Sequence, residues 1–422
     1  MVGTMAKIDD SVKKKVPELR FPGFTDDWEE RKLKDVTERV RSNDGRMDLP
    51  TLTMSASSGW LDQKDRFSGD ISGKEKKNYT LLKKGELSYN HGNSKLAKYG
   101  VVFSLTNYEE ALVPRVYHSF KALENTSADF IEYMFSTKLP DRELGKLISS
   151  GARMDGLLNI NYDDFMNIHI SIPNYEEQIL MSAFFRKLDE NIALHQRKLD
   201  LLKEQKKGYL QKMFPKNGEK VPELRFAGFA DDWEERKLGD IGDTFTGLTG
   251  KTKEDFGHGS AKFVTYVNVF QNPIATLDQL DAVEIDEKQN QVQKGDVFFT
   301  TSSETPEEVG MSSVWTYDTK NVYLNSFTFG YRPRVSFDLN YMASMLRSPS
   351  IRKKITFLAQ GISRYNISKT KMLEIEIPAP NLSEQKKIGS FFKLLDDTIA
   401  LHQRKLDLLK EQKKGFLQKM FV

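Results

Sequence analysis

The two halves of this 422-residue chain begin and end alike, whereas the segments between those borders differ. Residues 16–33 read VPELRFPGFTDDWEERKL, and residues 221–238 read VPELRFAGFADDWEERKL. Residues 192–214 and 399–421 share the run IALHQRKLDLLKEQKKG, followed by YLQKMF in the first half and FLQKMF in the second. Matching surfaces suit two copies of one partner, and differing surfaces suit two different ones. The repeat therefore predicts a symmetric frame that carries two unlike binding domains.

Composition narrows the class of protein. The length suits about two to four domains with real cores. Cysteine is absent, which excludes disulfides and thiolate metal sites and suits a reducing cytoplasm. No apolar run approaches the roughly 18–20 residues that span a bilayer, so we expect no membrane segment. Lys and Arg total 63 against 60 Asp and Glu, a net charge of +3. If the chain binds DNA, its basic surface is local or a partner supplies part of the phosphate contacts.

Each half is predicted to contain three parts. The opening motif reads as a hydrophobic clip and a helix start, with Asp26 or Asp27 as cap and Glu29 and Glu30 in the first turn. A middle segment of about 140 residues reads as a compact α/β domain, and a long helix closes the half. The expected divisions are an N-terminal arm (1–15), a first domain (16–173), a first long helix (174–214), a linker (215–220), a second domain (221–378) and a second long helix (379–421).

The middle segments mix strand and helix patterns. Strands are expected at Gly100–Leu105, Phe263–Phe270, Asp296–Thr300 and Ser326–Tyr331, where apolar and β-branched residues concentrate. Helices are expected at Ala128–Ser136 and Leu339–Leu346. A strand bounded by proline, Ile168–Pro173 in the first half and Ile375–Pro378 in the second, should precede each long helix.

The long helices carry the clearest periodicity in the sequence. Apolar residues alternate spacings of three and four, as in a coiled-coil seam, with His195, His402, Lys206 and Lys413 as polar interruptions. The predicted seam consists of Leu188, Ile192, Leu199, Leu202, Tyr209 and Met213 in the first helix, and Leu395, Ile399, Leu406, Leu409, Phe416 and Met420 in the second. An ordinary buried helix is the alternative, but the matched registers favour an antiparallel pair within the chain.

A second leucine stripe lies outside the seam. It comprises Leu194, Leu201 and Leu210 in the first helix and Leu401, Leu408 and Leu417 in the second. The helices are therefore apolar on more than one face, and this second face is expected to pack on their own domains or on another protein. At 1.5 Å per residue, each helix of 39 residues would be roughly 58 Å long.

Motifs for catalysis are lacking. Gly250–Lys251–Thr252 resembles the end of a phosphate-binding loop, but that motif needs glycine where Phe245 stands. No G-x-G-x-x-G opens a helix after a strand, the six histidines are scattered, and no G-x-S-x-G elbow occurs. Two carboxylates that meet in a cleft stay possible, although no particular pair is indicated. A stand-alone enzyme is therefore not favoured.

Polar loops at matching places in both halves suggest contacts with nucleic acid. They carry the amide, hydroxyl, imidazole and cationic side chains that bind base edges and phosphates. The alternative is that such glycine-containing loops are plain surface turns, and the paired placement favours the first interpretation. The candidates are Tyr89, Asn90, His91, Asn93, Lys95, Lys98 and Arg153 in the first half, and Thr300, Thr301, Ser302, Ser303, Arg364, Tyr365 and Lys369 in the second.

These motifs together resemble the DNA specificity subunit of bacterial type I restriction-modification systems. The resemblance rests on PELRFPGFxDDWEERKLxD at 17–35, on Gly–x–x–x–x–Asn–Ile–Ser at Gly361–Ser368, on the step I-P-x-P-x-x-x-E-Q at Ile377–Gln385, and on the duplicated HQRKLDLLKEQKKGxLQKMF. It covers the chain from about residue 15. In the first half the step, Ile172–Gln178, reads as two residues shorter and without the second proline, and the Asn–Ile–Ser lead-in is blurred over 151–161.

The resemblance implies a non-catalytic, cytoplasmic protein. Its two target recognition domains would be joined by two antiparallel helices, and each domain would read one half of a split, asymmetric DNA target. The helices would bind two copies of an adenine methyltransferase subunit, and two restriction or translocase subunits would join the complex. S-adenosylmethionine, ATP and Mg²⁺ would belong to those partners, leaving no cofactor or metal here. The alternatives are a single-chain restriction enzyme or methyltransferase with built-in recognition domains, and a coiled-coil scaffold without a DNA role.

Overall fold

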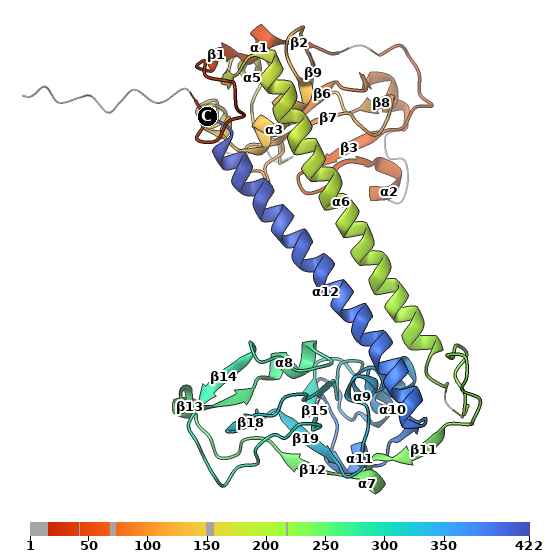
Figure 1. Cartoon of the computed structure of the whole chain (residues 1–422). Helices are drawn as coiled ribbons and strands as arrows, with labels where there is room; N and C mark the ends of the chain where they lie inside the picture. Colours follow the sequence, from red (N-terminus) through yellow and green to blue (C-terminus); the bar gives the residue numbers. More distant parts are fainter. Residues whose placement is uncertain (1–15, 42, 68–72, 149–155, 217) are drawn as a thin grey trace, which may run out of the picture. The chain divides into compact units, whose positions relative to one another are not determined.

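Two long helices dominate the fold. α6 (Tyr175–Lys212) and α12 (Leu382–Lys419) are each 38 residues long and end two residues before their predicted ends. The computed structural model describes residues 16–41, 43–67, 73–148, 156–216 and 218–422, so the expected N-terminal arm lies outside the described residues. The chain divides into two compact units, a first unit of residues 1–194 and 405–422 and a second unit of residues 195–404. Each unit contains one α/β domain and a stretch of each long helix (Figure 1).

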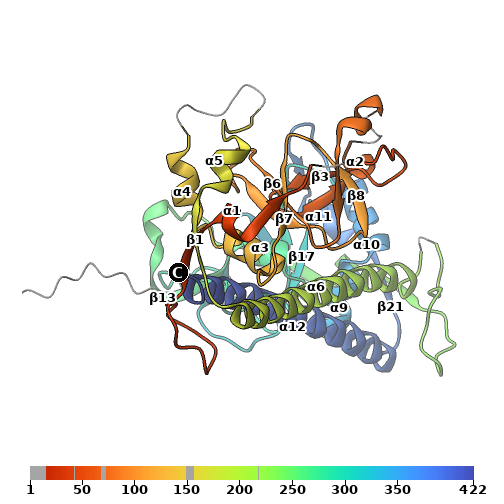
Figure 2. The same ribbon diagram turned by 90° about the horizontal axis from the view of Figure 1, so that it is seen from above.

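In each unit the two helix stretches pair in antiparallel fashion (Figure 2). In the first unit the rings of Phe184 and Phe416 meet at 5.0 Å, edge to face. In the second unit Tyr209 and Phe391 make the same kind of contact at 4.9 Å. Both pairs join α6 to α12, so aromatic contacts supplement the leucines of the seam.

The predicted seam residues are buried or half-buried. Leu199 and Leu406 are each 1% exposed, Leu202 and Leu409 are each 6% exposed, and Met213 and Met420 are buried. The remaining six, Leu188, Ile192, Tyr209, Leu395, Ile399 and Phe416, are half-buried. The seam therefore faces protein along both helices.

The polar interruptions of the seam are satisfied across the helix pair. In the second unit Lys206 Nζ donates to Asp396 Oδ1 at 2.5 Å, and the Nδ1 atoms of His195 and His402 lie 2.9 Å apart. In the first unit Lys413 Nζ donates to Asp189 Oδ1 at 2.5 Å. Each seam lysine thus meets an aspartate of the other helix, which favours this antiparallel register over others.

The first domain is built on an antiparallel sheet with strand order β2-β9-β6-β7. Shorter pairs β1-β10, β3-β4 and β5-β8 surround it. Its elements are β1 (Glu29–Lys32), α1 (Leu33–Val36), β2 (Thr37–Arg39), β3 (Leu52–Ser55), β4 (Gly59–Asp62), α2 (Gln63–Phe67), η1 (Gly73–Asn78), β5 (Thr80–Lys83), β6 (Leu87–Asn90), β7 (Val101–Ser104), β8 (Glu110–Val113), β9 (His118–Ala122), α3 (Ala128–Ser136), α4 (Asp141–Lys146), α5 (Tyr162–Met166) and β10 (His169–Ile172).

The second domain repeats this frame with the sheet β12-β19-β15-β17, and a further sheet, β14-β13-β18, lies beside it. The pairs β11-β21 and β16-β20 complete the strands. Its elements are β11 (Glu234–Lys237), α7 (Leu238–Ile241), β12 (Gly242–Thr246), η2 (Lys253–Asp255), β13 (Phe256–Val264), α8 (Tyr266–Gln271), β14 (Leu280–Val283), β15 (Val297–Thr300), β16 (Ser302–Ser303), β17 (Ser312–Val314), β18 (Val322–Leu324), β19 (Thr328–Pro333), α9 (Leu339–Leu346), α10 (Pro349–Leu358), β20 (Tyr365–Asn366), α11 (Lys369–Leu373) and β21 (Glu376–Ala379).

Two local predictions are wrong. The residues expected to start a helix in the opening motif form strand β1, which pairs with β10, and the helix begins only at Leu33. In the second half, the expected strand Phe263–Phe270 stops at Val264. Thr265 then caps α8, accepting a hydrogen bond from the backbone N–H of Asn268. A capping threonine ends the strand there although apolar residues continue.

The step into the first long helix is also not shortened, contrary to the sequence comparison. Glu29 pairs with Ile172, and Glu234 pairs with Ala379. Two residues after these partners, Asn174 and Asn381 accept the backbone N–H of Glu177 and Glu384 through Oδ1, at 3.0 and 2.9 Å. The two steps therefore have equal length. Pro173 matches Pro380, and Ser171 occupies the place of Pro378.

The Glu–Gln pair of each step fastens the helix to its domain. Glu177 forms a bidentate ion pair with Arg20 of the opening motif, both bonds at 2.8 Å, and Gln178 Oε1 accepts the N–H of Ser127, which caps α3. In the second half Glu384 binds Arg225 at 2.7 and 2.8 Å, and Gln385 accepts the N–H of the α9 cap. The Glu177 and Glu384 side chains are each 1% exposed. These pairs therefore clamp the start of each long helix.

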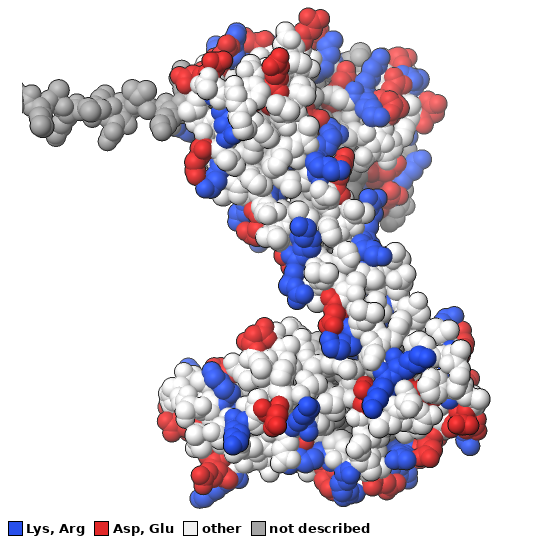
Figure 3. Space-filling view, viewed as in Figure 1, with Lys and Arg blue, Asp and Glu red and all other residues white. Residues whose placement is uncertain are grey.

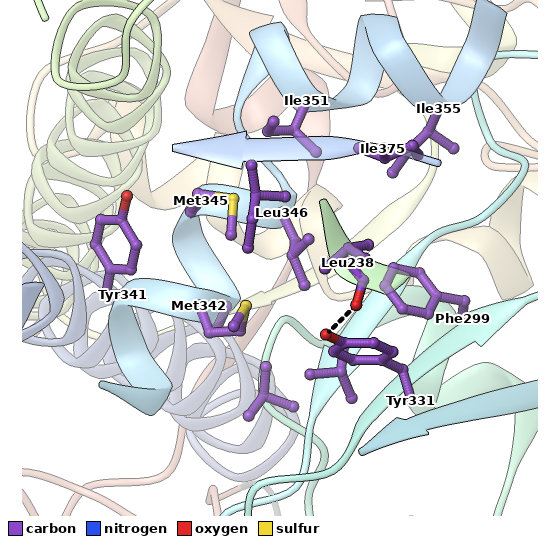
Figure 4. Close-up of a cluster of buried hydrophobic side chains, with 14 of the residues drawn as sticks. Leu238, Phe299, Tyr331, Tyr341, Met342, Met345, Leu346, Ile351, Ile355 and Ile375 are labelled. Atoms are coloured by element: carbon purple, nitrogen blue, oxygen red, sulfur yellow. Dashed lines mark hydrogen bonds between the residues drawn. The ribbon is translucent and has the colours of Figure 1, made fainter. Parts of the chain in front are cut away.

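Each core also receives the end of the helix that belongs to the other half. In the first unit Phe421, just past α12, packs on Trp28 with ring centroids 6.1 Å apart. In the second unit Phe214, just past α6, packs on Trp233 at 6.5 Å and on Tyr341 at 5.7 Å. Figure 4 shows the rest of this second core, where α9 and α10 cover the sheet and Tyr331 donates to the carbonyl of Leu238 at 2.9 Å.

We predict that Glu177→Gln lowers the free energy of unfolding of the first unit by about 3 kcal/mol, because Arg20 keeps its charge in a largely buried place without a carboxylate. Glu384→Gln should affect the second unit in the same way. Urea unfolding measures both changes. Glu29→Gln is the control, since the Glu29–Arg31 pair is exposed and should change stability by less than about 0.5 kcal/mol. If Glu177→Gln and Glu384→Gln lower the free energy of unfolding as little as Glu29→Gln does, the buried ion pairs do not act as clamps.

Candidate nucleic-acid interface

In the first unit the structure brings together the two polar loops that the sequence singles out. The loop after β6 bridges to the segment before α5 through Gly92 and Leu157. Asn93 donates its backbone N–H to the carbonyl of Gly156 at 2.9 Å, and Leu158 donates to the carbonyl of His91 at 2.8 Å. Arg153, the remaining candidate of this half, lies outside the described residues.

In the second unit the corresponding segments form a small antiparallel pair. Ser302 pairs with Asn366 and Ser303 with Tyr365, so β16 and β20 hold Arg364 beside the serine loop. Thr301 donates both its backbone N–H and its hydroxyl to the carbonyl of Phe327, at 3.1 and 2.8 Å. Phe327 is 65% exposed beside this loop, and it was not among the predicted residues.

Four of the predicted contact residues are buried. Tyr89 is fully buried, stacks on Phe165 at 4.2 Å and donates its hydroxyl to the carbonyl of Tyr99. Thr300 is also fully buried, and its hydroxyl accepts the N–H of Met311. His91 and Ser303 are buried and bonded to backbone groups. All four side chains are buried and stabilise the loops from inside the domain. The structure therefore gives no support for a direct DNA contact by these four residues.

The other predicted residues stand at the surface or near it. Asn93, Lys95, Lys98 and Arg364 are exposed, while Asn90, Thr301, Ser302, Tyr365 and Lys369 are half-buried. Asn90 Oδ1 accepts the N–H of Gly92 at 3.1 Å, so it shapes its loop. Both signs of charge are interspersed over the face of each unit that Figure 3 shows, as the balanced composition leads one to expect.

The sequence analysis did not predict one concentration of positive charge. A pocket of about 340 Å³ in the first unit is lined by Arg39, Arg41 and Arg115, together with His118 and Tyr162. The guanidinium of Arg39 lies over the Tyr162 ring, 3.9 Å from its centroid. Among the lining residues that the structure describes, none is Asp or Glu. The arginines come from two separated segments of the chain. The only local signal is the alternation Arg39–Val40–Arg41, which places two arginines on the same face of an extended segment.

The two histidines of this pocket stack on each other with ring centroids 4.9 Å apart. His91 lies between the carbonyl oxygens of Leu158 and Val116, at 2.7 and 3.1 Å, and His118 Nε2 donates to the carbonyl of Ile160 at 2.9 Å. Burial lowers the pKa of His118 from 6.5 to about 4, so this ring is neutral near pH 7.

Backbone packing explains why residues 247–252 resemble a phosphate-binding loop. A Cβ on Gly247 would lie 2.1 Å from the carbonyl oxygen of Asn325, so glycine is required by close backbone packing. Lys251 forms an ion pair with Asp286 at 2.9 Å, and only a short 3-10 turn, η2, follows. No group of three or more His, Asp or Glu that could hold a metal occurs in the described part of the chain.

Comparison with known proteins assigns the family. The sequence profile of the type I restriction modification DNA specificity domain matches residues 25–204 and 230–411, one copy in each half. This chain is a type I DNA specificity subunit by family. The paired loops, the charged pocket and the two helices described above are therefore features of a specificity subunit, which recognises DNA sequence as part of a restriction-modification system.

Curated relatives and solved structures agree with this assignment. A type I restriction enzyme specificity subunit assigned in Methanocaldococcus jannaschii and named MjaX is 24% identical over 93% of this chain and 92% of its own length. The MjaVIII specificity subunit of the same organism is 23% identical over 70% of each chain. The S subunit of the type I system from M. genitalium shares the fold, with a TM-score of 0.61, 14% identity and coverage of 96% of this chain and 99% of its own.

A chain from a structure of type I system assembly has a TM-score of 0.50 and 15% identity, with 96% of this chain and 99% of that chain covered. The fold class predicted from the sequence, two α/β domains with long antiparallel helices and an internal repeat, is thereby confirmed. No helix in the described residues combines the length and apolarity needed to cross a membrane.

We predict that the first unit loses stability as the pH falls from about 6.5 toward 4. The folded state holds His118 neutral, whereas the unfolded chain takes up a proton near pH 6.5, so acid favours unfolding. His118→Phe, which installs the residue that occupies the equivalent place in the second unit, should remove this component. Between pH 7.5 and 5 the wild type should lose roughly 1 to 2 kcal/mol more than the variant in urea unfolding. Parallel pH profiles would contradict this role of His118.

Proposed function

We propose that this specificity subunit is non-catalytic and reads a split, asymmetric DNA target with its two recognition domains. On its helices it presents equivalent docking surfaces to two copies of a DNA methyltransferase subunit, and restriction subunits join the larger complex. The observation that carries this proposal is the contrast between the repeated frame and the unlike reading surfaces. S-adenosylmethionine, ATP and Mg²⁺ belong to the partner subunits in this proposal, and the complex works in the cytoplasm.

The frame is repeated at the level of single bonds. The Arg20–Glu177 pair recurs as Arg225–Glu384, and the Lys413–Asp189 pair of the seam recurs as Lys206–Asp396. Two identical partners need two equivalent surfaces held at equivalent angles to their domains. The same clamps and the same seam pairs occur in both halves, and this repetition supports that arrangement.

The reading surfaces are not repeated. Sheet register places Thr300 of the second unit where the first unit has Asn90, and Thr301 where it has His91. The arginine pocket exists in the first unit, whereas the second unit exposes Phe327 and Arg364. Side chains of different hydrogen-bonding character recognise different base edges, so two unlike surfaces support an asymmetric target.

The second leucine stripe supports a docking surface on each helix. Leu194 and Leu201 are 56% and 51% exposed, and Leu401 and Leu408 are 59% and 51% exposed. The spacing of seven residues keeps the leucines of each helix on one face. Leu210 and Leu417, which continue the predicted stripe, pack against the domain cores instead. Exposed leucines at matched places in both repeats are unusual for a free surface and suit a repeated protein partner.

Exchange of residues 40–170 for the corresponding segment of another specificity subunit should change one half of the recognised sequence and leave the other half and the spacer intact. The reason is that this segment holds the reading loops of the first domain but neither long helix. The methylated motif of cells that express the hybrid chain with its methyltransferase measures the result. A change in both half-sites would refute the modular reading. Methyl transfer by the purified chain alone would favour the single-chain enzyme, and a complex without sequence preference would favour a scaffold.

Leu201→Glu and Leu408→Glu should each weaken the binding of one methyltransferase copy by tenfold or more, because burial of a leucine contributes about 1.5–3 kcal/mol and a carboxylate opposes burial. Native mass spectrometry should then show one bound copy for either single variant and none for the double variant. Lys203→Glu is the matched control, since it places a carboxylate on an exposed position of α6 away from the stripe. Full binding by the double variant would contradict the docking surface.

A further inference from the structure

The arginine pocket of the first unit contains arginines without a carboxylate partner among the described residues. Many arginines in the described residues are engaged by carboxylates, as Arg46 is by Asp44 and Glu110. Arg39, Arg41 and Arg115 are exposed, and no ion pair joins any of them to a described carboxylate. The nearest sequence neighbour with a negative charge, Glu38, is bound by Lys121 at 3.1 Å. Within the described part of the chain, three guanidinium groups without a carboxylate partner therefore line one hollow.

The groups at the floor and rim of the pocket are also compatible with a bound anion. Backbone carbonyl oxygens would repel a negative ligand, but that of Ile160 accepts from His118 Nε2, and His91 lies between those of Leu158 and Val116 and donates to the one that faces its protonated nitrogen. Tyr162 lies under the Arg39 guanidinium and restricts its rotamers, which reduces the entropy lost when Arg39 binds. Asn159, an exposed amide on the rim, adds a hydrogen-bond donor.

The second unit has the same backbone frame without this charge. Arg39 pairs with Phe120 in the first sheet, and Thr244 pairs with Tyr331 in the second. Continuing this register places Thr246 at the position of Arg41 and Phe329 at that of His118. Ser326, one residue before Phe327, takes the place of Arg115. Hydroxyl groups and a phenyl ring replace three arginines and a histidine, so the charge is not required by the fold.

We infer that this pocket binds a phosphate group of the DNA backbone next to the half-site read by the first domain, and that the second domain has no equivalent contact. The inference rests on the proposed function, because it needs DNA bound across the first domain. Guanidinium groups bind phosphate oxygens in bidentate fashion, and such a contact fixes the register of the protein on the duplex without reading sequence. The two domains then differ in how they are positioned as well as in what they read.

The test uses the full chain assembled with its methyltransferase subunit and a duplex that contains the methylated motif. Arg41→Gln combined with Arg115→Gln should lower affinity about tenfold and reduce the slope of log affinity against log salt by about one, while the preference for both half-sites is kept. Arg142→Gln, an exposed arginine on α4 outside the pocket, is the control and should change neither quantity. Unchanged thermal unfolding of the double variant shows that it folds.

Duplexes that carry one neutral methylphosphonate linkage locate the contact. The wild-type complex should lose about tenfold in affinity when the linkage falls at one phosphate beside the first half-site, and the double arginine variant should lose nothing further there. If every backbone position weakens wild type and variant alike, the inference is overturned, even if inorganic phosphate binds the pocket. A complex that binds no DNA sequence specifically would instead overturn the proposed function.

Discussion

The buried ion pairs Arg20–Glu177 and Arg225–Glu384 are the contacts on which the arrangement of each unit depends. Each joins the opening motif of a domain to the first turn of the long helix that follows it. The arginine in turn donates to a carbonyl of its own motif, that of Asp26 or Asp231. A charge buried without its partner is costly, so alternative angles between domain and helix are penalised. The opening motif and the helix start are therefore repeated together.

The two halves share the helices and these clamps. The loops at the ends of β6 and β15 differ between the halves. The framework tolerates this divergence because the buried members of each loop, such as Tyr89 in one domain and Thr300 in the other, hold it from within by different bonds. The exposed residues of these loops can then be exchanged without disturbing the sheet.

The sequence predicts the parts of the fold that depend on local patterns. Helices α3 and α9 match their predicted bounds, because a capping Ser127 or Asp338 precedes a strong apolar periodicity. Strand β1 is missed because its partner strand, β10, lies about 140 residues further along the chain, and no local pattern reveals a pairing at that distance. The polar loops are singled out by their composition, but the sequence does not predict that the two loops of each domain lie side by side or that some of the chosen residues are buried. The pocket arginines are missed because tertiary packing assembles them from Arg39, Arg41 and Arg115.

The ends of the repeats explain why similarity extends through the last aromatic residue of each helix. Phe421 completes the core around Trp28, and Phe214 completes the core around Trp233, so each domain contains a helix end contributed by the other half of the chain. Neither half alone can bury its own opening tryptophan in this way. The Trp28–Phe421 contact joins residues almost 400 positions apart and is slow to form, whereas Phe214 and Trp233 are only 19 positions apart. Each contact links the stability of one domain to the long helix that leaves the other. A substitution in one Met–Phe end should therefore weaken the domain of the opposite half, because that domain loses part of its own core.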